Sequence, residues 1–231
     1  MPMKPWDKQK QIQVSKERVA SIEEVIELGL GIKDEKIRAL FFITYLTGAR
    51  ICEVVRKYKF DIIQKPAPLE DYDVMISGKN IKRYMKKRVY DDDGNPIIER
   101  GMRRKDITFL NRDGRKIMLI FLRNEKNQKK LTKDIPIPLD RQETITIYNS
   151  IIDYITSIEM NDELFPFGYQ YAYRKIKGYF NPHWLRHLRA THLTVNYGFT
   201  ETELKIYLGW TDTRPAAHYI EMKWADLLNK L

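Results

Sequence analysis

The chain has 231 residues, of which 41 are Lys or Arg and 31 are Asp or Glu, so its formal net charge is +10. Hydrophobic residues make up 43% of the sequence, which suits one or two domains with a real core. The charge excess favours a polyanionic partner, most often nucleic acid, over the alternative of a device for solubility.

Cys52 is the only cysteine, which excludes an internal disulfide and a cysteine-based zinc site. The N-terminus has no apolar core of a secretory signal, and the longest apolar run, around residues 39–46, is too short to span a bilayer. We therefore expect a soluble cytoplasmic protein without a membrane partner.

Residues 1–20 are polar and basic and predict an arm ahead of the first helix. A capping-box pattern at Ser21 opens the stretch IEEVIELGL, a helix that Gly29 and Gly31 are expected to stop. Asp34 then caps a longer helix that ends at Gly48. A further helix is predicted over ARICEVVRKY, residues 49–58.

Residues 61–105 carry three prolines, an acidic run and the basic run KRYMKKR, and they show poor periodicity. We interpret this segment as an elaborated loop region with a short helix, inserted into one domain. A solvated charged loop and a DNA-facing insertion are both compatible with its composition.

Three β-rich stretches follow, ITFL, IMLIFL and DIPIPL, with the turn NRDGR between the first two. They predict a three-stranded antiparallel sheet with a basic connection, RNEKNQKKLTK, at one end. Helices are predicted again over 141–158, 168–180, 181–193 and 200–210. The fold class is therefore α+β, mainly helical with one small sheet.

The stretch NPHWLRHLRATHL holds three of the four histidines of the chain. His183 and Arg186 are three residues apart and share a helix face. A guanidinium grips two phosphate oxygens, and an imidazole titrates near neutrality, so the pair suits a phosphate site. Taken alone, the pattern is more often a solvated basic face.

Three separated motifs change this balance. The segment TGARICE contains a Thr-Gly-x-Arg-x-x-Glu pattern, the stretch HWLRHLRAT contains His-x-Leu-Arg-His-x-x-Ala-Thr, and Leu-Gly-Trp is followed nine residues later by Tyr219. In this order, over roughly residues 21–231, they resemble the tyrosine recombinase (phage integrase) family. The resemblance implies the catalytic-domain fold of that family.

The resemblance also implies roles for individual residues. Tyr219 is the expected nucleophile, activated by nearby positive charge because a phenol has a pKa near 10. Arg50 and Arg186 are expected to clamp the non-bridging phosphate oxygens. His183 assists proton transfer, and Trp210 stands where histidine is commoner and donates its indole N–H. Two further residues are expected to support these side chains: Glu53 and His187.

The leaving 5′ oxygen needs a proton donor, which in the family is a lysine between the second and third strands. The basic connection offers four lysines, and we select Lys126, with Lys129 as runner-up; the others are Lys130 and Lys133. No metal or other cofactor is expected, since two arginines can supply the charge of a metal. The expected DNA contacts are Lys82, Arg83, Lys86, Lys87, Lys129 and Lys130.

Full-length members of the family usually carry a separate helical domain before the first motif, so residues 21–231 resemble a catalytic domain alone, with 61–105 as an insertion. Residues 220–231 predict an amphipathic helix that docks either on a neighbouring subunit, in a tetramer on double-stranded DNA, or on its own core. The implied function is a site-specific recombinase or integrase of a virus or mobile element, working through a 3′-phosphotyrosyl link. Type IB topoisomerase activity and non-catalytic DNA binding with a relict site are the alternatives.

Overall fold

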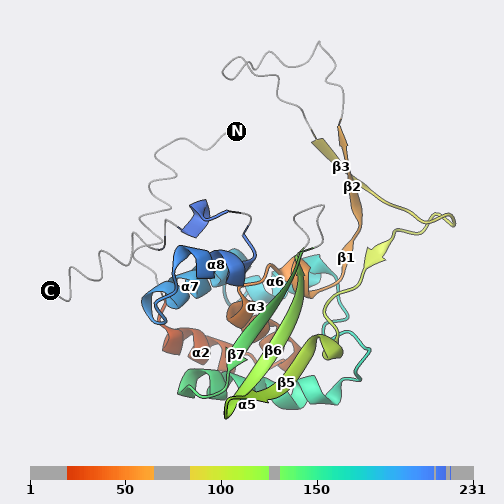
Figure 1. Ribbon diagram of the computed structural model, residues 1–231. Helices are drawn as coiled ribbons and strands as arrows, with labels where there is room; N and C mark the ends of the chain where they lie inside the picture. Colours follow the sequence, from red (N-terminus) through yellow and green to blue (C-terminus); the bar gives the residue numbers. More distant parts are fainter. Residues whose placement is uncertain (1–19, 65–83, 125–130, 211, 217–218, 220–231) are drawn as a thin grey trace.

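The computed structural model describes residues 20–64, 84–124, 131–210, 212–216 and 219 (Figure 1). Three of the sequence predictions therefore lie largely or wholly outside the described residues: the basic N-terminal arm, the loop between the second and third sheet strands, and the C-terminal helix. Among the described residues, no helix is long and apolar enough to cross a membrane.

The first two helices begin at the predicted caps. Helix α2 spans Ile22–Leu30 behind a complete Ser21 capping box, and α3 spans Glu35–Thr47 with the Asp34 carboxylate accepting two backbone N–H groups. Gly31 is the C-cap of α2, but the expectation that Gly29 stops this helix is wrong. A Cβ on Gly29 would lie 2.3 Å from the Phe42 ring, so this glycine permits close packing of α2 on α3.

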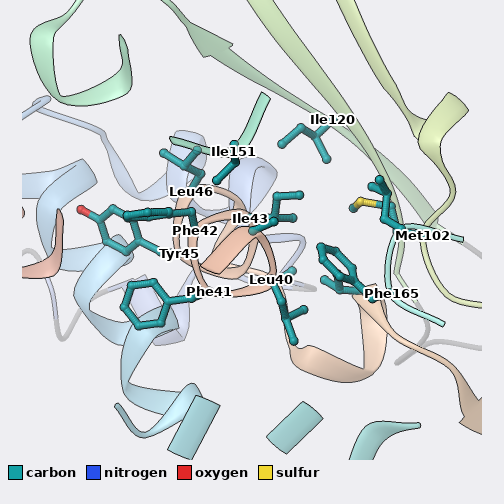
Figure 2. Packing of buried hydrophobic residues seen from close by; sticks show 14 of the residues in the cluster. Leu40, Phe41, Phe42, Ile43, Tyr45, Leu46, Met102, Ile120, Ile151 and Phe165 are labelled. Atoms are coloured by element: carbon teal, nitrogen blue, oxygen red, sulfur yellow. The ribbon is translucent and has the colours of Figure 1, made fainter. Parts of the chain in front are cut away.

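Helix α3 is the centre of the core (Figure 2). Every residue from Ala39 to Thr47 is buried, because α5, α6 and α7 all pack against this helix. Such burial on all sides explains why the helix is apolar around its whole circumference rather than along one stripe. It ends at Gly48, whose φ of 58° lies in the left-handed region that favours glycine.

The helix predicted over 49–58 is much shorter than expected. Helix α4 covers only Ile51–Val54, because Val55 is already extended and strand β1 (Lys57–Tyr58) follows. The described part of 61–105 is also corrected, since it holds strands β2 (Phe60–Gln64), β3 (Tyr84–Arg88) and β4 (Ile98–Glu99) in place of a loop with a short helix.

These strands form antiparallel pairs that extend from the body. Strand β1 pairs with β4, and β2 pairs with β3, so the chain leaves the core and returns to it as a long ribbon (Figure 1). A short 3₁₀ turn, η1 (Arg104–Asp106), leads from the ribbon into the main sheet. The sequence did not indicate these strands, because each is short and pairs with a strand far away in the chain.

The three-stranded antiparallel sheet is confirmed. Strands β5 (Ile107–Arg112), β6 (Arg115–Asn124) and β7 (Leu131–Pro138) lie in the order β5-β6-β7. The two-residue connection Asp113-Gly114 has positive φ at both positions, as the tight hairpin turn requires. One face of the sheet buries Met118, Ile120 and Ile135 in the core.

Four further helices follow the sheet: α5 (Gln142–Ser157), α6 (Tyr169–Lys177), α7 (Pro182–Val195) and α8 (Glu201–Leu208). All four were predicted from the sequence. After α8, residues 214–216 and 219 are helical as well. A second, smaller apolar cluster between α7 and α8 includes Leu193, Leu204, Leu208 and Tyr219. The predicted α+β class, mainly helical with a small sheet, is thus confirmed.

Candidate functional site

Helix α7 carries the His183 and Arg186 pair, and its start is fixed locally. The Asn181 side chain caps the helix by accepting from the His183 N–H, and Pro182 occupies the first helical position. Leu185 and Leu188 turn into the core. Burial of these two leucines fixes the orientation of α7, so that the Arg186 side chain points toward the neighbouring helices.

Arg186 joins the ends of two other helices. It is only 5% exposed, and its Nη1 and Nη2 donate to the backbone carbonyl oxygens of Gly48, at 2.5 Å, and Leu208, at 2.7 Å. Burial lowers the pKa of the guanidinium to about 10, and the charge of Arg50 adds to this effect. Arg186 therefore remains charged at neutral pH while its position is fixed by backbone oxygens.

Arg50 follows the left-handed turn at Gly48 and is the N-cap of α4. Its Nη1 donates to Glu53 Oε1 at 3.0 Å, and its backbone N–H donates to Glu53 Oε2 at 3.0 Å. The Glu53 side chain is only 3% exposed. Glu53 thus holds both the main chain and the guanidinium of Arg50.

Lys133 lies in the same charged cluster. Its Nζ is 3.9 Å from Glu53 Oε2, and its side chain is only 7% exposed. Among the described residues, Nζ has no hydrogen-bond partner. Burial lowers the pKa of Lys133 to about 8, with Arg186 and Arg50 adding to the fall and Glu53 opposing it.

The Tyr219 hydroxyl lies against α7, at the residue that follows Arg186. It shares a short hydrogen bond with His187 Nδ1, and the Tyr219 ring stacks on Trp210 with centroids 5.9 Å apart. Burial raises the pKa of Tyr219 to about 12, while the positive charge of Arg186 opposes the rise. A base beside the hydroxyl and a cation nearby are the two aids that a phenol needs to become a nucleophile.

His183 is exposed, and its ring meets the His187 ring edge-on at a centroid distance of 4.7 Å. Trp210 contacts both Arg186 and Tyr219, since the Arg186 guanidinium carbon is 5.8 Å from the Trp210 ring centroid and the Tyr219 ring stacks on this indole. Trp210 therefore connects Arg186 with Tyr219, and His187 connects Tyr219 with His183.

The structure thus brings together residues from five separated segments: the α3–α4 turn, β7, α7, the end of α8, and Tyr219. Lys126, Lys129, Lys130, Lys82 and Arg83 lie outside the described residues. Lys86 and Lys87 lie on β3, in the ribbon that extends from the body. No group of three or more His, Cys, Asp or Glu side chains that could hold a metal occurs in the described ranges.

From the sequence, His187 was expected only to support the site, and Lys126 and Lys129 were preferred to Lys133 as the proton donor. Strand alternation was the available signal for Lys133, because Lys133, Ile135 and Ile137 share one face of β7 and all are buried. No sequence signal showed that His187 contacts the Tyr219 hydroxyl, since that contact depends on how the chain returns after α8.

Comparison with known proteins supports the fold. No family model and no curated protein sequence matches the chain. Two crystal structures of the XerH site-specific recombinase are similar to it. The pre-cleavage complex bound to difH substrate is 15% identical over 86% of this chain and 48% of that chain, with a TM-score of 0.49. The post-cleavage complex bound to palindromic difH substrate is 14% identical over 90% and 50%, with a TM-score of 0.50.

The fold is that of a tyrosine recombinase catalytic domain. At 14% identity this likeness concerns the fold alone. The chain spans about half the length of the recombinase chain that it matches.

Proposed function

We propose that the chain is a site-specific DNA recombinase that cleaves and rejoins strands through a 3′-phosphotyrosyl intermediate on Tyr219. The observation that carries the proposal is the Tyr219 hydroxyl bound to His187 beside the carbonyl-anchored Arg186, on a recombinase fold. Electrostatic stabilisation by groups fixed before reaction is the largest source of rate in such sites.

In the proposed reaction, the Tyr219 oxygen attacks a backbone phosphorus and forms a P–O bond while the bond to the 5′ oxygen breaks. The phenolic proton passes to the His187 and His183 pair, and the leaving 5′ oxygen takes a proton from a lysine. Arg50 and Arg186 bind the non-bridging oxygens, whose charge increases in the transition state. A 5′ hydroxyl of a second strand reverses the step, so the phosphodiester bond is conserved.

We propose Lys133 rather than Lys126 as the proton donor to the 5′ oxygen. A pKa of about 8 keeps Lys133 mostly protonated at neutral pH, yet makes it a much stronger acid than an ordinary lysine. Its charge interacts with those of Arg50 and Arg186, the two residues proposed to bind the phosphate. Lys126 remains the sequence-based alternative, and parallel Lys133→Ala and Lys126→Ala variants distinguish the two.

Double-stranded DNA is the proposed substrate, and four subunits acting on two DNA sites are the proposed assembly. The net charge of +10 supports a polyanionic partner. The ribbon of β2 and β3 carries Lys86, Lys87 and Arg88 on one strand and extends well beyond the body. We propose that this ribbon contacts the DNA backbone and increases the number of neutralised phosphates.

The test is covalent capture of DNA. The probe is a pool of duplexes with a randomised central segment and a nick that releases the 5′ fragment after cleavage, so that rejoining is prevented. An adduct stable in detergent is expected with the wild type and is expected to disappear in Tyr219→Phe. Tyr179→Phe, at an exposed tyrosine after α6, is the matched control and should form the adduct normally.

Equal adduct in wild type and Tyr219→Phe would contradict the proposed nucleophile. DNA binding without adduct in either protein would indicate a non-catalytic DNA-binding protein. Sequences recovered from the adduct can be placed in pairs on supercoiled plasmids. Exchanged products would support recombination, whereas relaxation alone would indicate a topoisomerase.

A further inference from the structure

A second arginine of α7, Arg189, is buried without a carboxylate partner. It is 5% exposed, and no carboxylate of the described residues forms an ion pair with it. Its guanidinium carbon lies 5.5–5.6 Å from the ring centroids of Tyr45, Tyr197 and Tyr207. An unpaired buried charge is strongly destabilising unless other groups compensate it. The groups that surround the Arg189 guanidinium therefore show which parts of the fold it connects.

One hydrogen-bonded chain runs from Arg189 to the end of α3. Nη2 of Arg189 donates to the Tyr207 hydroxyl at 3.1 Å, and that hydroxyl donates to the Leu46 carbonyl at 2.6 Å. Leu46 lies in the last turn of α3, where the helix dipole and unpaired carbonyls favour a cation. The aromatic faces and the helix end together compensate the charge.

This chain parallels the contacts of Arg186. The two arginines are three residues apart on α7 and share a face. Arg186 binds the carbonyls of Gly48 and Leu208, while Arg189 connects Leu46 and Tyr207, which lie two and one residues earlier in the same two segments. Methylenes of Arg189 also lie beside Gly48, 3.7 Å from the position of a Cβ there.

We propose that Arg189 is a positioning residue for the phosphate site. Through Tyr207 it fixes the end of α8 against the end of α3, and so it holds the two carbonyls that orient Arg186 and the turn that carries Arg50. The catalytic part of this inference rests on the proposed function. Its structural part does not.

The test compares Arg189→Met, Tyr207→Phe and the double variant with Tyr197→Phe as the matched control. Tyr197 also stacks on Arg189, but its hydroxyl donates to Glu143 on α5. Arg189→Lys keeps the charge without the planar fork, so partial rescue is expected. Each protein is measured well below its unfolding temperature. Should Arg189→Met fail to fold, Tyr207→Phe carries the test.

The first readout is amide hydrogen exchange of Gly209 and Trp210, whose N–H groups close the end of α8, and it requires no DNA. Exchange is expected to become about ten-fold faster in Arg189→Met and Tyr207→Phe and to stay unchanged in Tyr197→Phe. The second readout is single-turnover cleavage of captured DNA at saturation. In Arg189→Met and Tyr207→Phe, the cleavage rate is expected to fall about ten-fold while the DNA Kd changes less than about two-fold. The double variant should be no slower than the slower of the two single variants, because both substitutions break the same hydrogen-bonded chain.

Unchanged amide exchange of Gly209 and Trp210 in Arg189→Met and Tyr207→Phe would overturn the inference, whatever the DNA assays show. A wild type that forms no adduct, with exchange altered as expected, would contradict the proposed function and leave the positioning role of Arg189 standing. Additive losses in the double variant, or a DNA Kd that weakens in step with the rate, would show that Arg189 does not act on Arg186 through Tyr207.

Discussion

Replacement of Glu53 by glutamine should change the pH dependence of DNA cleavage. Glu53 is the neighbour that raises the pKa of Lys133, against burial and two arginines that lower it to about 8. At the Nζ to Oε2 separation of 3.9 Å, two unit charges interact by about 1 kcal/mol in a water-like dielectric and by about 4 kcal/mol at an effective dielectric constant of about 20. Because about 1.4 kcal/mol corresponds to one pH unit, Glu53→Gln should move the titration of Lys133 down by about one to three pH units.

The assay is the single-turnover cleavage rate between pH 5 and 10. If protonated Lys133 donates to the 5′ oxygen, the wild-type rate should fall above a midpoint near pH 8, and in Glu53→Gln the fall should begin at lower pH. A substrate with sulfur in place of the bridging 5′ oxygen is the control, since a thiolate leaves without a proton. With this substrate, the alkaline fall should be absent in both proteins.

The comparison of oxygen and sulfur substrates separates Lys133 from other effects of the substitution. Glu53→Gln also weakens the hold on Arg50, but that loss slows both substrates equally at all pH values. An oxygen-specific midpoint that stays in place in Glu53→Gln would refute the reasoning, as would an intact alkaline fall in Lys133→Ala. In the second case, Lys126→Ala should be the variant that abolishes it.

Three further predictions concern the fold. Burial lowers the pKa of His192 from its usual 6.5, so the unfolded chain binds a proton at this residue more readily than the folded one. The contribution of His192 to the free energy of unfolding should therefore be fully present above about pH 6.5 and be lost as the pH falls below it. Chemical denaturation at a series of pH values should show this loss in the wild type and not in His192→Asn. Gly29→Ala should destabilise the protein by about 1–3 kcal/mol, because the new Cβ would meet the buried Phe42 ring; an unchanged melting temperature would contradict this packing. Asp34→Ala should lower the free energy of unfolding by about 1 kcal/mol through loss of the α3 cap, whereas Asp34→Asn should retain most of it.

Local signals predicted the elements well where one rule dominated. The caps at Ser21 and Asp34 and the left-handed glycine Gly48 lie where the sequence placed the ends of helices. Each of these depends on the chemistry of a few neighbouring residues. The same rule failed at Gly29, because its role depends on an aromatic ring of another helix.

The predictions for residues 49–58 and 61–105 were wrong for a different reason. The pairing of β2 with β3 is antiparallel across a long separation in the chain, and no periodicity within either strand reveals a partner so distant. The residues 51–58 have helical spacing, yet the main chain turns extended at Val55 because its continuation pairs with β4. Tertiary pairing therefore overrides local preference there.

The candidate site shows a similar division between what the sequence reveals and what it does not. The resemblance of three separated motifs to one family led us to expect Arg50, Arg186 and Tyr219 in one site. The partners that set their chemistry are supplied by tertiary structure. Burial between β7 and α4 lowers the pKa of Lys133, and the return of the chain after α8 brings the Tyr219 hydroxyl to His187.

The two buried arginines of α7 are held by main-chain oxygens rather than by carboxylates. Arg186 is bound by carbonyl oxygens of two other segments, and Arg189 reaches a third carbonyl through Tyr207. Carbonyls reduce the cost of burying a guanidinium without neutralising it, whereas a carboxylate would cancel the charge that a phosphate needs. The buried carboxylate of the cluster, Glu53, pairs with Arg50 and lies close to Lys133, while the positive charge of Arg186 lowers the pKa of Tyr219 against the effect of burial.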